Sequence, residues 1–275
     1  MRNIKLTLEY DGTNYSGWQR QARQSVKTLQ GEIERALSIL LGEPIEVNAA
    51  GRTDAGVHAF GQVVNFITAS NMTIRRIPYS LNALLPDDIA AKDAEEVPES
   101  FDARRDPEWR EYRYYILNRS YRSVFVGRFV HHEARPLDVE AMNKAVGFLK
   151  GRHDFTSFFT ASDKNAVPVD NPVRTILEIS CRRSADIVWA GEPIEGLVTL
   201  CVRAHAFLHN MVRIIAGTAI DVGLGKLSPS DIPAILEAKN RQAAGRTAPA
   251  KGLTLAKVKY PGNVLPIIPF TPQKA

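Results

Sequence analysis

The sequence has little cysteine and no long apolar run, and each shortage excludes a class of protein. Its 275 residues include two cysteines, Cys181 and Cys201, and no CxxC pair. That is too few thiols for a disulfide framework or a cysteine-rich zinc site, so we expect both to be buried and reduced. No stretch approaches the roughly 18 apolar residues that a membrane span needs. The N-terminal segment lacks the unbroken apolar run of a signal peptide, which favours a cytoplasmic location without membrane attachment.

The composition that remains is typical of a globular enzyme with a basic surface. Hydrophobic residues make up 44%, charged residues 24%, and the formal net charge is +5 with a pI of about 9.2. Basic proteins often bind polyanions, because Lys and Arg neutralise phosphates. The arginines gather in two places, although an ordinary solvated face would also explain them. They are Arg20, Arg23, Arg104, Arg105, Arg110 and Arg113.

Apolar periodicity predicts an α+β chain with antiparallel sheets in two α/β halves. Periodicity breaks near residues 100–108, so we expect the halves to be residues 1–105 and 106–275. The predicted strands are 4–10, 45–49, 62–68, 89–97, 111–117, 173–182, 196–204 and 253–259. The predicted helices are 26–41, 74–85, 138–150, 207–222 and 230–239. The polar, turn-rich segment 161–172 is expected to be a mobile loop.

The most informative stretch is AGRTDAGVHA, residues 50–59, which lies between two predicted strands. Its glycines allow tight turns and close approach to a ligand. Arg52 lies two residues before Asp54, so an anion-binding group stands beside a carboxylate that it can hold ionised. On spacing alone, the same residues suit a surface turn with an Arg–Asp ion pair equally well.

The run GRTDAGVHA resembles the signature loop of the TruA family of tRNA pseudouridine synthases, and further motifs follow in the family's order. The resemblance extends from residue 4 to about residue 260. The other motifs are LEYDGTNYSGWQRQ (8–21), TLQGEIERAL (28–37), GQVVNF (61–66), LNALLPDDI (81–89), FDAR (101–104), YRYYI (112–116), DFTSF (154–158), NPVRTI (171–176) and AFLHNMVRIIAG (206–217).

The resemblance implies an isomerase that converts uridine to pseudouridine at positions 38, 39 and 40 of the tRNA anticodon stem-loop. By resemblance, Asp54 is the nucleophile and Arg213 pairs with it, while Tyr112 stacks on the target base. Arg52 is implied to bind the RNA near the target uridine. His58 closes the loop, where a structural hydrogen bond or an RNA contact would suit it. The resemblance also implies a central catalytic cleft between the halves, and a homodimer whose two subunits share one tRNA.

These roles agree with the chemistry of the reaction. The uracil must leave C1′ through its N1 bond and be rejoined through C5, which is an isomerisation that needs no cofactor or metal. A carboxylate could attack C1′, add to C6, or remove the 2′ proton to give a glycal, and all three need an ionised aspartate. The base must also be flipped from its stack, and the Tyr112 hydroxyl is a candidate to accept the C5 proton afterwards.

Two alternatives from other classes remain open at this point. One is a non-catalytic tRNA-binding or chaperone protein on the same fold, which the intact candidate site residues argue against. The other is a metal-dependent RNA-processing enzyme. Cys201, His205 and His209 are each four residues apart, but Cys201 lies on a predicted strand and no acidic ligand is near in sequence. The segment 159–172 departs from the loop of many relatives, which leaves its RNA contacts undefined.

Overall fold

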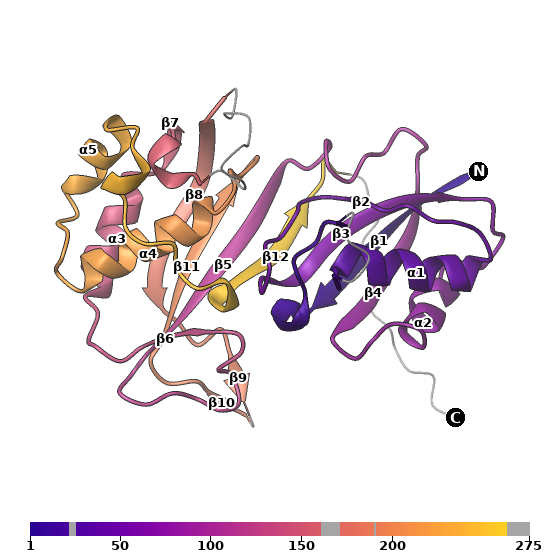
Figure 1. Cartoon of the computed structure of the whole chain (residues 1–275), viewed down its shortest axis with the longest axis horizontal. Coiled ribbons are helices and arrows are strands. Elements are labelled where there is room, and N and C mark those ends of the chain that lie inside the picture. The colour runs from indigo at the N-terminus through magenta and orange to yellow at the C-terminus, as the bar shows by residue number, and fades with distance from the viewer. Residues whose placement is uncertain (22–25, 161–170, 190, 263–275) are drawn as a thin grey trace.

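Ten strands join one curved sheet in the order β4-β1-β3-β12-β5-β11-β8-β7, with β2 beside β3 and β6 beside β5 (Figure 1). The computed structural model describes residues 1–21, 26–160, 171–189 and 191–262. The sheet strands are β1 (Arg2–Tyr10), β2 (Asn48–Ala49), β3 (His58–Thr68), β4 (Ile89–Val97), β5 (Trp109–Asn118), β6 (His131–Glu133), β7 (Gly151–Asp154), β8 (Val173–Arg183), β11 (Leu197–Ala204) and β12 (Leu253–Lys259). A separate pair is formed by β9 (Val188–Trp189) and β10 (Glu192–Pro193).

Strand β12 joins two antiparallel groups into this single sheet. The first group is β4-β1-β3 and the second is β5-β11-β8-β7. β12 runs parallel to β3, with Thr254 opposite His58, and antiparallel to β5, with Thr254 opposite Arg113. The predicted α+β class with antiparallel sheets is confirmed, and the two expected sheets meet edge to edge through a strand from late in the chain.

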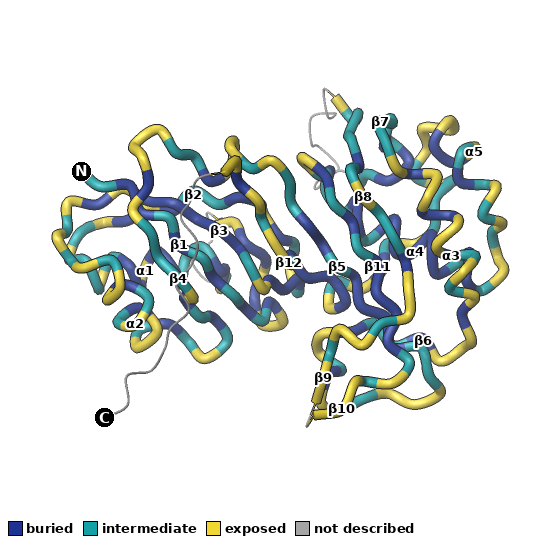
Figure 2. The backbone as a smooth tube through the Cα atoms, turned by 180° about the vertical axis from the view of Figure 1, so that it is seen from behind, coloured by how far each residue is buried: buried dark blue, intermediate teal, exposed yellow. Residues whose placement is uncertain are grey.

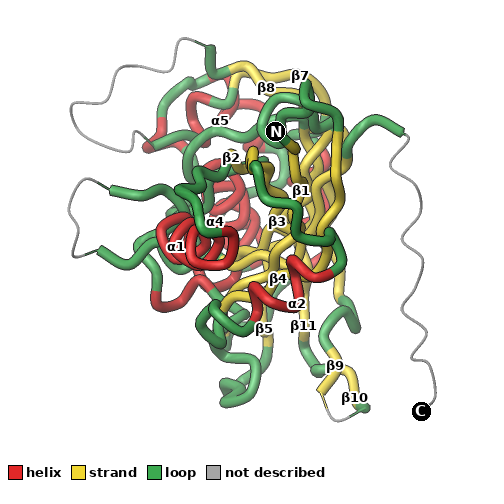
Figure 3. The backbone as a smooth tube through the Cα atoms, turned by 90° about the vertical axis from the view of Figure 1, so that its right-hand side faces the viewer, coloured by secondary structure: helices red, strands yellow, loops and turns green. Residues whose placement is uncertain are grey.

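The helices gather on one face of the sheet (Figure 3). They are α1 (Leu29–Leu41), α2 (Arg76–Asn82), α3 (Val139–Gly147), α4 (Met211–Gly223) and α5 (Asp231–Glu237). Ile4, Leu6 and Leu8 alternate along β1 and share one buried core with Ile33 and Leu37 of α1. The buried residues run continuously through the centre of the sheet (Figure 2). Among the described residues, no helix has the length and apolar character to cross a bilayer.

Local signals explain where the helices begin and end. Thr28 caps α1 by accepting a hydrogen bond from Gly31 N at 3.3 Å, and Gly42 ends the helix at φ 74°. α4 begins four residues later than the predicted start at 207. The backbone of Asn210 is left-handed, with φ 61°, and this interrupts any earlier helix. Residue 209 therefore lies outside the helix.

Two sequence expectations fall on parts of the chain that the structure does not describe. Of the expected mobile loop at 161–172, residues 161–170 lie outside the part of the chain that the structure describes. Arg23 also lies outside the described residues.

Candidate active site

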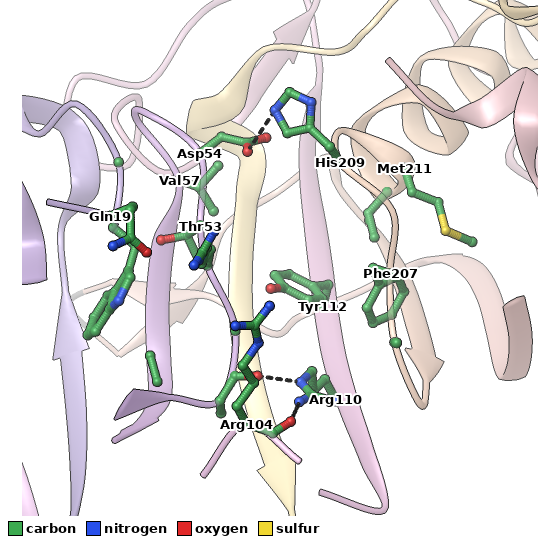
Figure 4. Close-up of a pocket in the computed structure, with 18 of the residues that line it drawn as sticks. Gln19, Thr53, Asp54, Val57, Arg104, Arg110, Tyr112, Phe207, His209 and Met211 are labelled. Carbon is green, nitrogen blue, oxygen red and sulfur yellow. Dashed lines mark hydrogen bonds and ion pairs between the residues drawn. The ribbon is translucent and has the colours of Figure 1, made fainter. Parts of the chain in front are cut away.

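A cleft of about 1290 Å³ opens between the β2–β3 loop and the turn that precedes α4 (Figure 4). Both groups of strands contribute to its lining, because the loop belongs to the first group and α4 covers the second. The lining segments also include the loop after β1 and the start of β5. The cleft thus lies across the join between the two groups, where the resemblance placed a catalytic site.

The β2–β3 loop carries Asp54 and is held in place by the segment that follows β1. Trp18 N donates a hydrogen bond to Thr53 O at 2.9 Å. Gly12 passes so close that a Cβ there would lie 2.0 Å from Val57 O, which only a glycine avoids. The loop's position is therefore fixed by residues more than thirty positions earlier in the chain.

Asp54 lies between the side chains of a histidine and an arginine. Its Oδ1 is 3.3 Å from His209 Nε2 (Figure 4). Its Oδ2 is 3.2 Å from Arg213 Nη1. Partial burial opposes ionisation of the carboxyl, but the contacts with His209 and Arg213 outweigh it and lower the pKa of Asp54 below its ordinary value. The carboxylate is therefore ionised at neutral pH, as a nucleophile or base must be.

Arg213 is oriented by its own neighbours before any substrate arrives. Its Nη1 donates to Asn210 Oδ1 at 2.7 Å, and its Nε donates to Ala248 O at 2.9 Å. The left-handed backbone of Asn210 directs that side chain toward α4. The ion pair joins positions 159 residues apart in sequence, Arg213 and Asp54.

Tyr112 forms an aromatic wall of the cleft. Its ring is only 7% exposed and packs edge-on against Phe207, with centroids 5.0 Å apart and planes at 85° (Figure 4). Burial and the nearby Asp54 charge raise the pKa of Tyr112 to about 12, against the opposing effect of Arg110. The hydroxyl thus stays protonated at neutral pH.

The other two tyrosines of this strand have different surroundings. Tyr114 is fully buried and donates from Oη to Pro249 O at 2.8 Å. Tyr115 faces the opposite side of the sheet, in a second hollow that also contains Thr254. Tyr114 therefore belongs to the main hydrophobic core.

The cleft lining is strongly basic. Arg52 lies exposed on it, and Arg213 rather than Arg52 makes the ion pair with Asp54. The sequence-based interpretation of an ion pair within the loop itself is therefore not what the geometry shows. The other arginines on the lining are Arg104, Arg105, Arg110 and Arg174.

Arg110 connects three segments of the cleft through their backbone carbonyls. Its guanidinium donates to Ala50 O at 2.7 Å and His205 O at 2.5 Å. It also donates to Arg104 O at 2.6 Å (Figure 4). These carbonyls belong to the β2–β3 loop, the turn before α4 and the segment before β5. The sequence grouped Arg110 only with other arginines, because backbone acceptors leave no trace in a sequence.

His58 is buried away from the cleft lining. Its ring is 2% exposed, its Nδ1 accepts from Gly12 N at 3.1 Å, and its Nε2 lies 3.1 Å from Arg128 O. This geometry suits a structural hydrogen-bonding role and gives no direct path to a ligand in the cleft.

The residues considered for a metal site point to separate partners. His205 Nδ1 lies 2.6 Å from Glu108 O, whereas His209 contacts Asp54. Within the described ranges, no three or more His, Cys, Asp or Glu side chains come together in a way that could hold a metal ion. Cys181 is buried and Cys201 is half-buried, and both are free thiols.

The sequence did not predict the contact of His209 with Asp54. His209 was considered only as a possible metal ligand. The available signal was its spacing, because His209 lies four residues before Arg213, just ahead of the helix that carries Arg213.

Comparison with known proteins identifies one family. The chain matches the family described as tRNA pseudouridine synthase over residues 7–106 and 145–261. It is 47% identical to tRNA pseudouridine synthase A of Anoxybacillus flavithermus, over 94% of this chain and 99% of the relative. It is 44% identical to the protein of that name from Bacillus subtilis, covering 94% and 98%, and 43% identical to that from Acetivibrio thermocellus, covering 94% and 100%.

Proposed function

The chain belongs to the tRNA pseudouridine synthase family, and from this we propose that it isomerises uridines 38, 39 and 40 of the tRNA anticodon stem-loop with Asp54 as nucleophile. The observation that carries the proposal is the Asp54 carboxylate, held ionised by Arg213 and His209 inside a basic cleft. Ionisation is what every route to glycosidic cleavage needs from this residue.

The cleft also offers a surface for the flipped base. Tyr112 presents an aromatic ring on the lining that contains Asp54, and a uracil stacked on it would be held while it rotates from N1 to C5. The neutral Tyr112 hydroxyl could then relay the proton released at C5. Tyr112→Phe tests this, because it keeps the ring and removes the hydroxyl. We expect kcat to fall by about a hundredfold with KM little changed, measured as pseudouridine formed per enzyme.

The arginines of the lining are the proposed phosphate contacts. Arg52, Arg104 and Arg105 are exposed on it, so their charges can neutralise phosphates next to the flipped nucleotide. His58 is instead proposed to support the β2–β3 loop through its bonds to Gly12 and Arg128.

The proposal extends to the two halves of the chain and to its assembly. We propose that residues 1–105 and 106–275 act as the two halves of the cleft, and that two copies of the chain share one tRNA in the cytoplasm. A patch of exposed apolar side chains away from the cleft supports the homodimer as its candidate interface: Val124, Phe125, Val188 and Trp189. The rings of Phe125 and Trp189 stack with centroids 5.0 Å apart, which is a costly arrangement to leave in water. Sedimentation of Trp189→Glu tests this, since a homodimer through this patch would dissociate.

The deciding experiment uses tRNA labelled with tritium at C5 of its uridines. Rejoining through C5 releases the label to water, so release reports the complete reaction. We expect release by the wild type and none by Asp54→Asn, which keeps the shape of the side chain but removes its charge. Asp87→Asn is the matched control, because Asp87 is an exposed carboxylate in the second hollow.

Each outcome distinguishes the proposal from the alternative. Release by Asp87→Asn but not by Asp54→Asn, with tRNA binding retained, would support catalysis by Asp54. Absence of release by the wild type on any tRNA would favour the non-catalytic tRNA-binding protein. Release by Asp54→Asn would keep the activity and reject Asp54 as nucleophile.

A further inference from the structure

Both ring nitrogens of His209 face hydrogen-bond acceptors. Nδ1 lies 2.7 Å from the carbonyl oxygen of Thr160, with the Asn210 Nδ2 amide farther away at 3.5 Å, and Nε2 lies 3.3 Å from Oδ1 of Asp54. A neutral imidazole carries a hydrogen on one nitrogen only, so it would direct a lone pair at one of these oxygens. The imidazolium form supplies a hydrogen to both. The surroundings of His209 therefore fit a cation.

We propose that His209, as an imidazolium, is a positioning residue for the reaction that clamps Asp54 together with Arg213. The inference rests on the proposed function, because it assumes that the Asp54 carboxylate does the chemistry.

The two cations take different oxygens of the same carboxylate. His209 lies beside Oδ1 and Arg213 beside Oδ2, so rotation of the carboxylate is opposed at both ends. Either cation alone would leave one oxygen free to turn. Small displacements of a reacting group are costly to catalysis, so a fixed carboxylate raises the fraction of bound complexes that can react.

The clamp also crosses the join between the two groups of strands. Asp54 belongs to the β2–β3 loop, whereas His209 lies in the turn before α4 and Arg213 lies in the first turn of α4. The backbone of Thr160 makes a second contact with the same residue, His209, because Thr160 N donates to the carbonyl oxygen of His209 at 3.5 Å. The nucleophile is therefore positioned from the side of the cleft opposite to its own loop.

The charge on His209 makes the clamp dependent on pH. Among the described residues, the charged groups that face His209 are Asp54 from the β2–β3 loop and Arg213 from α4, and Thr160 presents only its carbonyl. The contact with Asp54 raises the pKa of His209 above its ordinary value, against the effects of burial and of Arg213. Because this pKa is raised, the clamp is complete at lower pH and is lost as pH rises through it.

The test compares the pH profiles of tritium release by the wild type, His209→Ala and His209→Gln. We expect kcat of His209→Ala to fall by about tenfold to a hundredfold below the histidine pKa, since a charge-assisted contact is lost. KM should change little. The wild type should lose activity on the alkaline side, and both variants should lack that decline. His209→Gln, which retains a neutral donor, should lose less than His209→Ala.

The matched control is His153→Ala. His153 lies on β7 and its Nε2 contacts one backbone carbonyl, Lys150 O, at 2.9 Å, so its loss should leave both kcat and the pH profile unchanged. A His209→Ala enzyme with wild-type kcat and the same alkaline decline would overturn the inference. A rise in KM at unchanged kcat would also overturn it, because it would make His209 an RNA-binding residue.

A second measurement does not depend on any His209 variant folding. Nitrogen NMR titration of His209 in the wild type and in Asp54→Asn should show a lower pKa in the variant, because the carboxylate partner is gone. Equal pKa values would overturn the inference. The proposed function fails separately, if Asp54→Asn still releases tritium.

Discussion

Two histidine–aspartate pairs lie in two hollows on opposite faces of the sheet, and the pKa of the histidine is shifted in opposite directions in the two pairs. In the second hollow, His58 Nδ1 is 3.1 Å from Asp11 Oδ1, and in the cleft, His209 Nε2 is 3.3 Å from Asp54 Oδ1. Burial lowers the pKa of His58 in spite of its aspartate, whereas the aspartate contact raises the pKa of His209. Distance to a carboxylate alone therefore does not decide the state of a histidine.

The remaining partners of each ring explain the difference. His58 Nδ1 faces Asp11 Oδ1 but also accepts a hydrogen bond from Gly12 N at the same distance of 3.1 Å, and Nε2 faces the carbonyl of Arg128, so a neutral ring satisfies Gly12 and Arg128. His209 faces an acceptor with each nitrogen. The side chain of His58 is 3% exposed and that of His209 is 36% exposed, so only the second charge has access to water. We therefore expect the first pair to contribute to stability and the second to the proposed reaction.

Removing the Arg213 guanidinium, which lies beside the His209–Asp54 pair of the cleft, should have the largest effect on activity. We expect Arg213→Gln to lower kcat/KM by about a hundredfold to a thousandfold, because a partly buried carboxylate loses its charged partner. The pKa of Asp54 is lowered in the wild type, so its activity persists as pH falls. In the variant that pKa should rise, and the acid decline of tritium release should move to higher pH. Exposed Arg152→Gln should change neither quantity.

Loosening the frame around the cleft pair should have an intermediate effect. Arg110→Lys keeps the charge but cannot reach all three carbonyls that the guanidinium joins. We expect about a tenfold loss of kcat, since the β2–β3 loop would shift relative to α4. A variant with normal kcat would show that the loop holds Asp54 without this brace.

Changing the buried pair should affect stability rather than chemistry. We expect His58→Ala to lower the free energy of unfolding by about 2–4 kcal/mol, because it removes a packed ring and two hydrogen bonds. The kcat of the folded enzyme should stay near that of the wild type. Denaturant titration and tritium release measure the two effects. If His58→Ala lost activity at unchanged stability, His58 would contribute to the reaction, as His209 is proposed to do.

Acid should weaken the fold through its neutral histidines. The pKa of His58 is lowered by burial, and burial also lowers the pKa of His131 to about 4. The unfolded chain then binds more protons below about pH 6.5, so stability should fall as pH decreases from there, by up to about 1.4 kcal/mol per pH unit for each histidine. Denaturant midpoints should show a shallower slope in His131→Gln. An unchanged slope would show that His131 does not contribute to the loss of stability in acid.

A chelator should have the smallest effect of all. Since His209 contacts Asp54 and His205 contacts a backbone carbonyl, we expect tritium release to be the same with and without EDTA. Loss of activity that added metal restores would instead favour a metal-dependent enzyme.

The sequence predicted local structure well where local signals decide it. The strands at residues 89–97 and 253–259 match to the residue, and the first helix ends at Leu41, before Gly42, as predicted, although it begins at Leu29 and not at residue 26. The third strand was expected from 62, but it begins at His58. There the loop has ended and pairing with β12 has started, and a partner from nearly two hundred residues later in the chain is not visible in local periodicity.

The candidate site was likewise predicted only in part. Its residue types followed from motifs such as GRTDAGVHA and HNMVR, because they resemble a known family. The Asp54–Arg213 pair followed only from that resemblance, since it spans 159 residues and depends on the left-handed backbone at Asn210. The contact of His209 with Asp54 did not follow from the sequence. The role of Arg110 was likewise hidden, because all three of its partners are backbone oxygens.

The central place of β12 has a consequence for how the protein is made on the ribosome. Residues 253–259 emerge after every other strand of the sheet, yet they lie between β3 and β5. Until then the two groups of strands each have an unpaired edge where β12 will lie, which is a state prone to mispairing. Assembly of the sheet is therefore a late event in synthesis. A nascent chain stalled before residue 253 would lack the strand that joins the two sides of the cleft.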